Sequence, residues 1–392
     1  MKKVLVPRVR FKGFSEEWKE ERFGDTIEPY RLKNDNKEKL TSYSISNKFG
    51  FVNQKEFFEN GGKAIRADKS NSLVVFPNSF AYNPARIDVG SIGLYTKEEK
   101  CLVSPIYEVF KTDKKMNDEF LFNWFKTDEF KWIVNKSKEG SVRNTVYLRN
   151  ISDYLINITS YIEQQKISKL LDYISNLINL EEIKLNKLKQ LKETLLQKMF
   201  PEGNSKTPRI RFKVFEEEWK EEKLEDIFKV ITGGEPPKNY KNSKHPVGKY
   251  KYPIYSNGQE ANAIWGFSDN YSINTEAITI SSIGTIGFPV VRKMFFTPII
   301  RLKTLLPYNK NMNINFLNLS VSQINFSFNQ AGIPSMNSNQ LKDNIVLISR
   351  NFSEQQKIGD FFSKIDSLLS LYQSKLNKLR QIKEALLQKM FL

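Results

Sequence analysis

The amino-acid sequence predicts an α+β protein with two mixed α/β domains, separated by a long antiparallel two-helix coiled coil and related by a pseudo-twofold internal repeat. Three observations lead to this prediction. Two collinear repeats divide the 392 residues into two copies of one plan. Each copy ends in a long segment with apolar residues at heptad spacing. Ahead of these segments, short β-rich runs alternate with turn residues, which is typical of compact mixed domains.

The repeats are found near the start and at the end of each copy. Residues 7–25 match residues 208–226 at 13 of 19 positions, and residues 163–200 match residues 354–391 at 22 of 38 positions, both without a gap. The offsets are 201 and 191, so the second copy is ten residues shorter between its matching ends. The segments between the repeats show only scattered likeness. The sequence therefore predicts a shared frame that holds two different inserts.

The two long segments are predicted to be helices. Ser160 with Glu163, and Ser353 with Gln356, have the spacing of a capping box, and Pro201 ends the first segment. Apolar side chains three and four residues apart form a seam along each helix. A second apolar stripe flanks it, with Leu171, Ile178, Leu185 and Met199 in the first helix and Phe362, Leu369, Leu376 and Met390 in the second. The predicted seam consists of Ile167, Leu170, Ile174, Leu177, Leu188 and Leu195 in the first helix and Ile358, Phe361, Ile365, Leu368, Leu379 and Leu386 in the second.

Each helix needs a partner for its apolar stripe. Thirty-eight residues span about 57 Å, and the two stripes match in length, which favours an antiparallel pair within one chain. Packing within separate domains, or a zipper between two copies of the chain, remains an alternative. The predicted divisions are a first domain at 1–158, the first long helix at 159–201, a second domain at 202–350 and the second long helix at 351–392.

Each insert has about 130 residues, an ordinary domain size. The runs 72–77, 106–110, 277–280 and 299–302 are predicted strands, and 118–132 and 314–324 are predicted helices. Each insert is therefore expected to be a compact α+β domain with a twisted sheet.

The charge balance points to a polyanionic partner. Lys and Arg number 61 against 44 Asp and Glu, a formal net charge of +17. The two helical repeats carry +2 and +3, which leaves +12 on the inserts and joining segments. Such an excess suits nucleic acid, or less often an anionic membrane face. Cys101 and His245 are single, which excludes an intramolecular disulfide and a Cys-based zinc ribbon and disfavours a His-based triad.

The insert loops contain residues suited to reading base edges and holding phosphates. Arg pairs well with guanine, Asn and Gln with adenine, and Lys anchors phosphate as a point charge. The predicted DNA-binding residues are Ser46, Asn47, Lys48, Lys63, Arg66, Asn83, Arg86, Arg143 and Asn144 in the first insert and Lys238, Lys241, Lys244, Tyr250, Ser256, Asn257, Gln259 and Thr285 in the second. Taken alone, such a residue is more often an ordinary surface or packing residue, so the prediction rests on their sum and on the net charge.

Catalytic and cofactor motifs are missing from the sequence. Gly62-Lys63 is followed by Ala64, so no phosphate-binding Walker motif is present. Tyr82-Asn83-Pro84-Ala85 and Glu235-Pro236-Pro237-Lys238 both fail the Asn/Asp-Pro-Pro-Tyr/Phe signature of an amino-methyltransferase. With neither an apolar run near 18 residues nor a signal peptide, a cytoplasmic, non-catalytic binder without a metal or cofactor of its own is expected.

The layout resembles the specificity subunit of type I restriction–modification systems. The resemblance is carried by the two helices that begin Glu-Gln-Gln-Lys-Ile and end Leu-Leu-Gln-Lys-Met-Phe, by Thr232-Gly233-Gly234-Glu235-Pro236, and by Tyr255-Ser256-Asn257-Gly258. It covers essentially the whole chain. The first insert departs from the family, because it lacks the Gly-Gly-x-Pro element after Asp25.

The resemblance implies that each insert is a target-recognition domain for one half of a bipartite double-stranded DNA target, with the helix pair setting the gap. It also implies two modification (methyltransferase) subunits that bring S-adenosylmethionine, and restriction (motor and nuclease) subunits that use ATP and magnesium. A coiled-coil interaction scaffold whose basic domains bind a protein or an anionic surface is the alternative. A self-sufficient methylase is disfavoured by the missing motifs.

Overall fold

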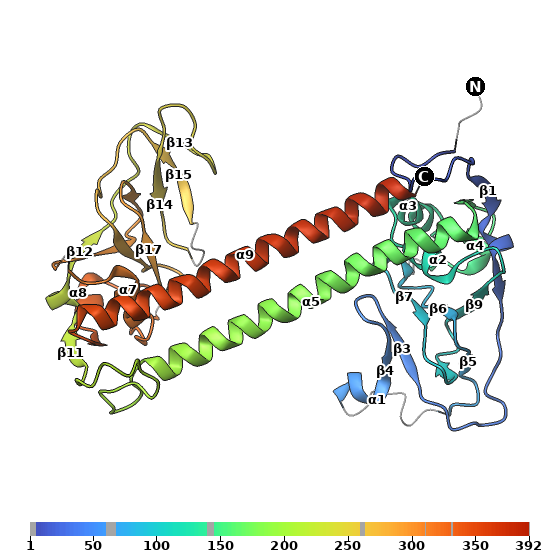
Figure 1. Ribbon diagram of the computed structural model, residues 1–392, viewed down its shortest axis with the longest axis horizontal. Helices are drawn as coiled ribbons and strands as arrows, with labels where there is room; N and C mark the ends of the chain where they lie inside the picture. Colours follow the sequence, from blue (N-terminus) through green and yellow to red (C-terminus); the bar gives the residue numbers. More distant parts are fainter. Residues whose placement is uncertain are drawn as a thin grey trace. The chain divides into compact units, whose positions relative to one another are not determined.

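The computed structural model describes residues 5–59, 68–138, 145–258, 263–309, 311–330 and 332–391. The chain forms two compact units (Figure 1). The first unit contains Met1–Glu182 and Ser374–Leu392, and the second contains Ile183–Gln373. The long helices α5 (Tyr161–Met199) and α9 (Phe352–Met390) each contribute one part to each unit. Both units are therefore assembled from both copies of the repeat.

The first unit is built on a four-stranded antiparallel sheet in the order β2-β9-β6-β7. Its strands are β2 (Ile27–Pro29), β9 (Glu108–Thr112), β6 (Ser79–Tyr82) and β7 (Ile92–Tyr95). It also contains the strand pairs β3 (Tyr43–Ser46) with β4 (Gly50–Asn53) and β5 (Leu73–Val75) with β8 (Cys101–Val103). Its short helices are α1 (Gln54–Phe57), α2 (Asp118–Trp124), α3 (Asp128–Lys136) and α4 (Leu148–Ile151). Aromatic side chains, including stacked Phe80 and Phe110, fill the core.

The second unit repeats this sheet in the order β12-β19-β16-β17, again antiparallel. Its strands are β12 (Phe228–Thr232), β19 (Lys303–Pro307), β16 (Ala277–Ser281) and β17 (Gly287–Arg292). A second four-stranded sheet contains β13 (Tyr240–Lys241), β15 (Ile264–Ser268), β14 (Tyr252–Tyr255) and β18 (Thr297–Pro298). The short helices are α6 (Leu224–Ile227), α7 (Ile314–Val321) and α8 (Ser338–Lys342). The predicted α+β class and internal repeat are confirmed.

Two predicted elements of the inserts differ in the structure. The predicted helix 118–132 is two helices, because the side chain of Thr127 caps a new helix start by accepting from the backbone of Phe130. The predicted strand 299–302 is wrong: the chain turns at Ile300 and Arg301, and β19 begins only at Lys303.

The frame segments form the same strand pair in each unit. β1 (Lys19–Arg22) pairs antiparallel with β10 (Leu155–Ile158), and β11 (Lys220–Lys223) pairs antiparallel with β20 (Ile345–Ile348). β10 directly precedes α5, and β20 directly precedes α9. The chain entering each domain is thereby joined to the chain leaving it.

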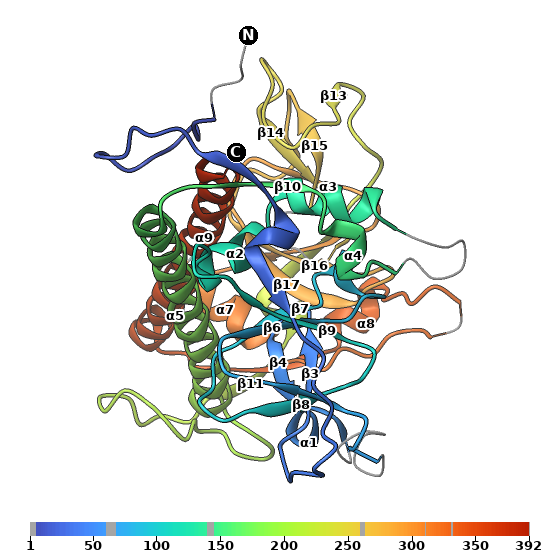
Figure 2. The ribbon, with the colours of Figure 1, turned by 90° about the vertical axis from the view of Figure 1, so that its right-hand side faces the viewer.

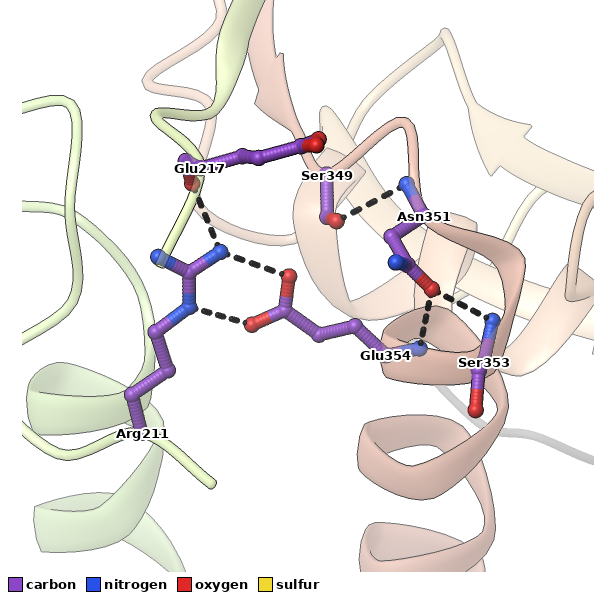
Figure 3. A network of polar contacts seen from close by, with 6 residues as sticks. All are labelled: Arg211, Glu217, Ser349, Asn351, Ser353 and Glu354. Atoms are coloured by element: carbon purple, nitrogen blue, oxygen red, sulfur yellow. Dashed lines mark hydrogen bonds and ion pairs between the residues drawn. The ribbon is translucent and has the colours of Figure 1, made fainter. Parts of the chain in front are cut away.

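A buried ion pair ties each frame segment to the start of a long helix. Arg211 donates from Nε and Nη2 to the two carboxylate oxygens of Glu354, at 2.6 and 2.9 Å, and also to the backbone oxygen of Glu217 (Figure 3). Arg10 makes the same fork with Glu163, at 2.7 and 2.8 Å. Both glutamate side chains are fully buried. Two-pronged Arg–carboxylate bonds fix orientation as well as distance, so each domain entrance is held rigidly on its helix.

Trp18 and Trp219 occupy matching, buried positions in the two frames. Trp18 packs on Phe391, the residue after α9, and Trp219 packs edge-on against Phe200, the residue after α5. The end of each long helix is therefore anchored in the domain that belongs to the other copy.

Within each unit, α5 and α9 pack in opposite directions. In the first unit, Ile167 near the start of α5 shares a core with Met390 at the end of α9. In the second unit, Met199 at the end of α5 shares a core with Ile358 near the start of α9. Figure 2 also shows the two helices side by side. The pairing is therefore antiparallel in both units.

The buried seam lies one position away from much of the predicted stripe. The buried apolar positions are Ile167, Leu171, Ile174, Leu185 and Met199 in α5 and Ile358, Phe362, Ile365, Leu376, Leu387 and Met390 in α9. Predicted residues Leu170, Leu177, Leu188, Leu195, Phe361, Leu379 and Leu386 are only partly buried. Leu368 is 44% exposed, so its assignment to the seam is wrong. Each helix has two adjacent apolar stripes, and successive residues are about 100° apart, so only one stripe can face the partner.

The middle of the helix pair is polar. Glu181 is almost fully buried in the line of the seam, and its Oε1 atom lies 3.0 Å from the Nζ atom of Lys375. Glu182 bonds Arg380 at 2.6 Å beside it. These cross-helix pairs fix the register of the helices, as buried polar residues do in other coiled coils.

Candidate nucleic-acid interface

In the first unit, two polar loops come together beside the sheet. The β3–β4 turn presents Asn47 and Lys48, and the Ser46 hydroxyl fixes this turn by accepting from the backbone of Lys48 at 3.2 Å. In the second loop, the Asn83 side chain accepts from the backbone of Ala85 at 3.0 Å, and Arg86 is exposed. Ser46, Asn47 and Arg86 line a common depression of about 200 Å³. Ser46 and Asn83 therefore shape the turns, while Asn47, Lys48 and Arg86 project from them.

A larger cleft of about 1330 Å³ lies between these loops and the long helices of the first unit. Its lining contains Lys48, Lys97, Lys126, Lys131 and Lys383 against Asp88, Glu119 and Asp172. Burial, helped by the positive charge of Lys383 and opposed by Asp172, lowers the pKa of Lys126 to about 8. The excess of lysine makes this cleft attractive to an anion.

In the second unit, a cluster of motif residues forms where its two sheets meet. Gly234 bridges to Ile299, beside the parallel pairing of β14 with β18. The Asn257 side chain accepts from the backbone of Ser282 at 2.8 Å and donates to the carbonyl of Ile300. The sequence motifs around residues 233, 257 and 282 are thus brought together from separate parts of the domain.

A buried lysine forms hydrogen bonds next to this cluster. Lys303 donates to the hydroxyls of Thr232 and Ser338, at 3.0 and 2.9 Å. Burial lowers the pKa of Lys303, and the nearby charge of Arg301 lowers it further. Lys303 and Arg301 were missed by the sequence analysis, because the apolar run around them is typical of a strand.

The β13–β15 region of the second unit is exposed, basic and aromatic. The Nζ atoms of Lys241 and Lys249 lie 5.8 and 5.4 Å from the ring centroid of Tyr250, and Tyr240 packs on Trp265 at 4.6 Å. Lys238 and Lys244 are exposed nearby in the sequence. Cations held over aromatic rings at a domain surface are suited to contact phosphates.

The predicted DNA-binding residues fall into three groups. Asn47, Lys48, Arg86, Lys238, Lys241 and Lys244 are exposed, and Ser46, Asn83, Tyr250, Ser256, Asn257 and Thr285 are partly buried. Lys63, Arg66, Arg143, Asn144 and Gln259 lie outside the described residues. A role in DNA binding stays a prediction for all of them. Within the described ranges, no helix has the length and apolarity to cross a membrane, and no cluster of three or more His, Cys, Asp or Glu residues could hold a metal ion.

The doubled frame and the doubled sheet agree with a known family. The sequence model of the type I restriction modification DNA specificity domain matches residues 16–190 and again residues 216–381. The chain belongs to this family. The two specificity-domain matches together span most of the chain, one for each copy of the repeat.

Relatives and solved structures agree with this assignment. Two type I specificity subunits of Mycoplasma pneumoniae are each 35% identical, over 144 and 113 residues, or 36% and 28% of this chain. These matches cover 39% and 33% of the relatives' own length. The S subunit of the type I system from M. genitalium superposes with a TM-score of 0.64 over 99% of both chains at 14% identity. A chain from a study of type I complex assembly and conformational transition gives 0.54 over 94% and 96% at 15% identity. At such identities the structural likeness shows the fold alone.

Proposed function

We propose that this chain is the non-catalytic DNA-binding subunit of a type I restriction–modification complex and that it reads an asymmetric, bipartite target. One observation carries the proposal: a duplicated frame holds two domains with the same sheet order and different polar loops. A duplicated frame gives two equivalent reading positions. Unlike loops give two unlike half-sites, so the target is not a palindrome.

The charge distribution supports duplex DNA as the ligand. The net charge of +17 resides mainly outside the long helices, on the domains and frame segments. Phosphate contacts of this kind provide affinity and lose it steeply as salt rises. Exposed Asn and Arg side chains on rigid turns provide the groups that distinguish bases.

We further propose that the helix pair sets the spacer between the half-sites. Both helices are 39 residues long, and each is anchored by an Arg–Glu fork at its start and a Trp–aromatic contact at its end. Such anchoring makes helix length the natural measure of spacer length. The sequence of the spacer is then free, while its length is fixed.

Exposed apolar residues on the helices support two copies of a partner subunit. Leu180 and Ile382 are exposed in the first unit, and their repeat equivalents Leu371 and Leu191 are exposed in the second. Each unit thus presents the same apolar pair, which suits two identical modification subunits. In this proposal those subunits bring S-adenosylmethionine, restriction subunits bring ATP and magnesium, this chain binds no cofactor, and the complex acts in the cytoplasm.

Exchange of one domain tests the reading function. Residues 227–345 are replaced by the corresponding domain of another specificity subunit, and methylated sites are mapped genome-wide in cells that carry the assembled system. One half-site should change while the other half-site and the spacer stay the same. A folded chimera that loses both half-sites would overturn independent reading. Binding to protein partners without any DNA selection would favour the scaffold alternative.

Lengthening the helices tests the spacer function. Seven residues are inserted after Glu182 in α5 and after Gln373 in α9, where the two units divide. A heptad adds about 10 Å of helix, which corresponds to about three base pairs at 3.4 Å each. Both half-sites should persist with a longer spacer in the methylation map. An unchanged spacer in a folded, active variant would rule out the helix pair as the measure.

A further inference from the structure

Two successive residues of the second unit adopt a conformation that their side chains disfavour. Ile300 has φ +52° and Arg301 has φ +60°, both in the left-handed region. A non-glycine residue there is uncommon, and a β-branched residue such as Ile300 is a genuine outlier. Strain of this kind persists only where the surrounding structure imposes it, and it concentrates at functional sites.

Four hydrogen bonds impose this turn. The backbone of Ile300 donates to the carbonyl of Gly234 at 2.8 Å, and that of Arg301 donates to the carbonyl of Gly233 at 2.9 Å. Their own carbonyls accept from the side chains of Asn257 and Ser282. Every backbone polar group of the two residues is therefore bonded, and three separate segments of the domain take part.

Gly233 is required for this close approach. A Cβ atom at residue 233 would lie 2.8 Å from backbone atoms of both Pro298 and Ile299. The strained turn and the glycine thus belong to one assembly, in which backbone meets backbone without an intervening side chain.

The Arg301 side chain projects from this rigid turn into solvent. Within the described residues Arg301 has no ion pair, and its positive charge repels that of the neighbouring Lys303. The strain and the repulsion of the two cations both oppose folding, so packing alone does not account for an arginine at this position. A guanidinium carries donors in a planar fork, and a fixed backbone limits where that fork can point.

We propose that Arg301 is a specificity-determining residue that reads a guanine in the second half-site, with the strained turn as its rigid mount. The guanidinium donates two hydrogen bonds to the O6 and N7 atoms of the base in the major groove. This inference rests on the proposed DNA-binding function. It gives Arg301 a different role from the exposed lysines at residues 238, 241 and 244, whose flexible side chains are suited to phosphate contacts.

Selection from a randomised DNA library tests the proposal. The full chain, assembled with its modification subunits, is compared with Arg301→Ala, Arg301→Lys and the control Arg350→Ala, which removes an exposed arginine of the frame. Arg301→Ala should relax one G·C pair of the second half-site, with about 5- to 150-fold less discrimination there. The other positions should keep their preference. Arg301→Lys keeps the charge but lacks the planar fork, so it should retain most affinity and still lose the guanine preference.

Three outcomes would overturn the inference. A uniform loss of affinity across sequences would identify a phosphate contact, unchanged selection would exclude a role, and an equal effect of Arg350→Ala would exclude a local one. A wild-type complex that selects no sequence would instead refute the proposed function itself.

The mount is tested separately with Ile300→Gly. Glycine adopts the left-handed region without strain, so the melting temperature should stay the same or rise. Discrimination at the same base pair should nevertheless fall, because the added freedom loosens Arg301. Full discrimination in Ile300→Gly would show that a rigid mount is unnecessary.

Discussion

The two domains fill the same place in the fold in different ways. In the first unit, Arg31 follows β2 and its guanidinium donates to the carbonyls of Pro105 and Tyr107, just before β9. In the second unit, Gly233 and Gly234 follow β12 and bond the backbone at Arg301 and Ile300, just before β19. The first domain joins these two segments through an arginine side chain, and the second domain joins them through backbone hydrogen bonds at two glycines. The shared sheet fixes where this turn lies, and the local turn chemistry decides which groups the turn exposes.

The largest expected difference between the units concerns the Arg–Glu forks. Removing one partner of a buried ion pair costs about 3–5 kcal/mol. Glu354 is held by Arg211, whereas Glu163 also accepts from the hydroxyl of Thr159. Arg211→Ala should therefore destabilise the second unit by about 3–5 kcal/mol, and Arg10→Ala should destabilise the first unit less. Urea unfolding of each variant, with hydrogen exchange as the probe of each unit, measures the two losses of stability. Equal losses would show that Thr159 contributes nothing.

The next largest effect is expected at the glycine pair. Gly233→Ala forces a Cβ against two backbone segments and should destabilise the second unit by about 1–3 kcal/mol. Recognition of the second half-site should fail while the first half-site is kept. Gly234→Ala is the matched control, because a Cβ there meets nothing within 4 Å. Thermal melting and DNA selection report on the two effects, and similar behaviour of the two variants would contradict this account.

The smallest effect concerns the cleft of the first unit and depends on pH. Lys126 has a folded-state pKa of about 8, below its ordinary value of 10.5. The unfolded chain therefore binds more protons between these pH values, and stability rises as pH rises through that window. Lys126→Met should stabilise the first unit at pH 7 by about 1–2 kcal/mol.

The gain from Lys126→Met should shrink as pH rises from 8 to 10.5, which urea unfolding at several pH values measures. Lys131→Met, an exposed lysine of the same cleft, should change stability little at pH 7. A gain from Lys126→Met that stays constant up to pH 10.5 would show that burial of its charge is not the cause.

The sequence predicts the helices closely and the seam less well. The repeats place the helices at 163–200 and 354–391, and the structure has them at Tyr161–Met199 and Phe352–Met390. Heptad spacing and capping residues are local signals, so they can be read directly. The choice between Leu170 and Leu171 as a seam position depends on how two helices meet, and adjacent apolar stripes do not reveal it.

The candidate site was only partly predictable for a similar reason. Motif residues such as Gly233 and Asn257 stand out by type, and the structure brings them together. Ile300 and Arg301 do not stand out, because Ile-Ile-Arg-Leu is a typical strand sequence. Their turn depends on bonds to residues 233, 234, 257 and 282, which are remote in the chain.

Each long helix ends in the domain of the other copy, and this sets the order in which the two units can be completed during synthesis. The second unit is one continuous stretch, Ile183–Gln373, and has all of its parts once Gln373 has left the ribosome. The first unit needs Leu387, Met390 and Phe391 for its core and the carbonyl of Lys389 for the backbone of Val9. The domain that is made first is therefore finished last, and loss of the final helical turns would damage the opposite end of the sequence.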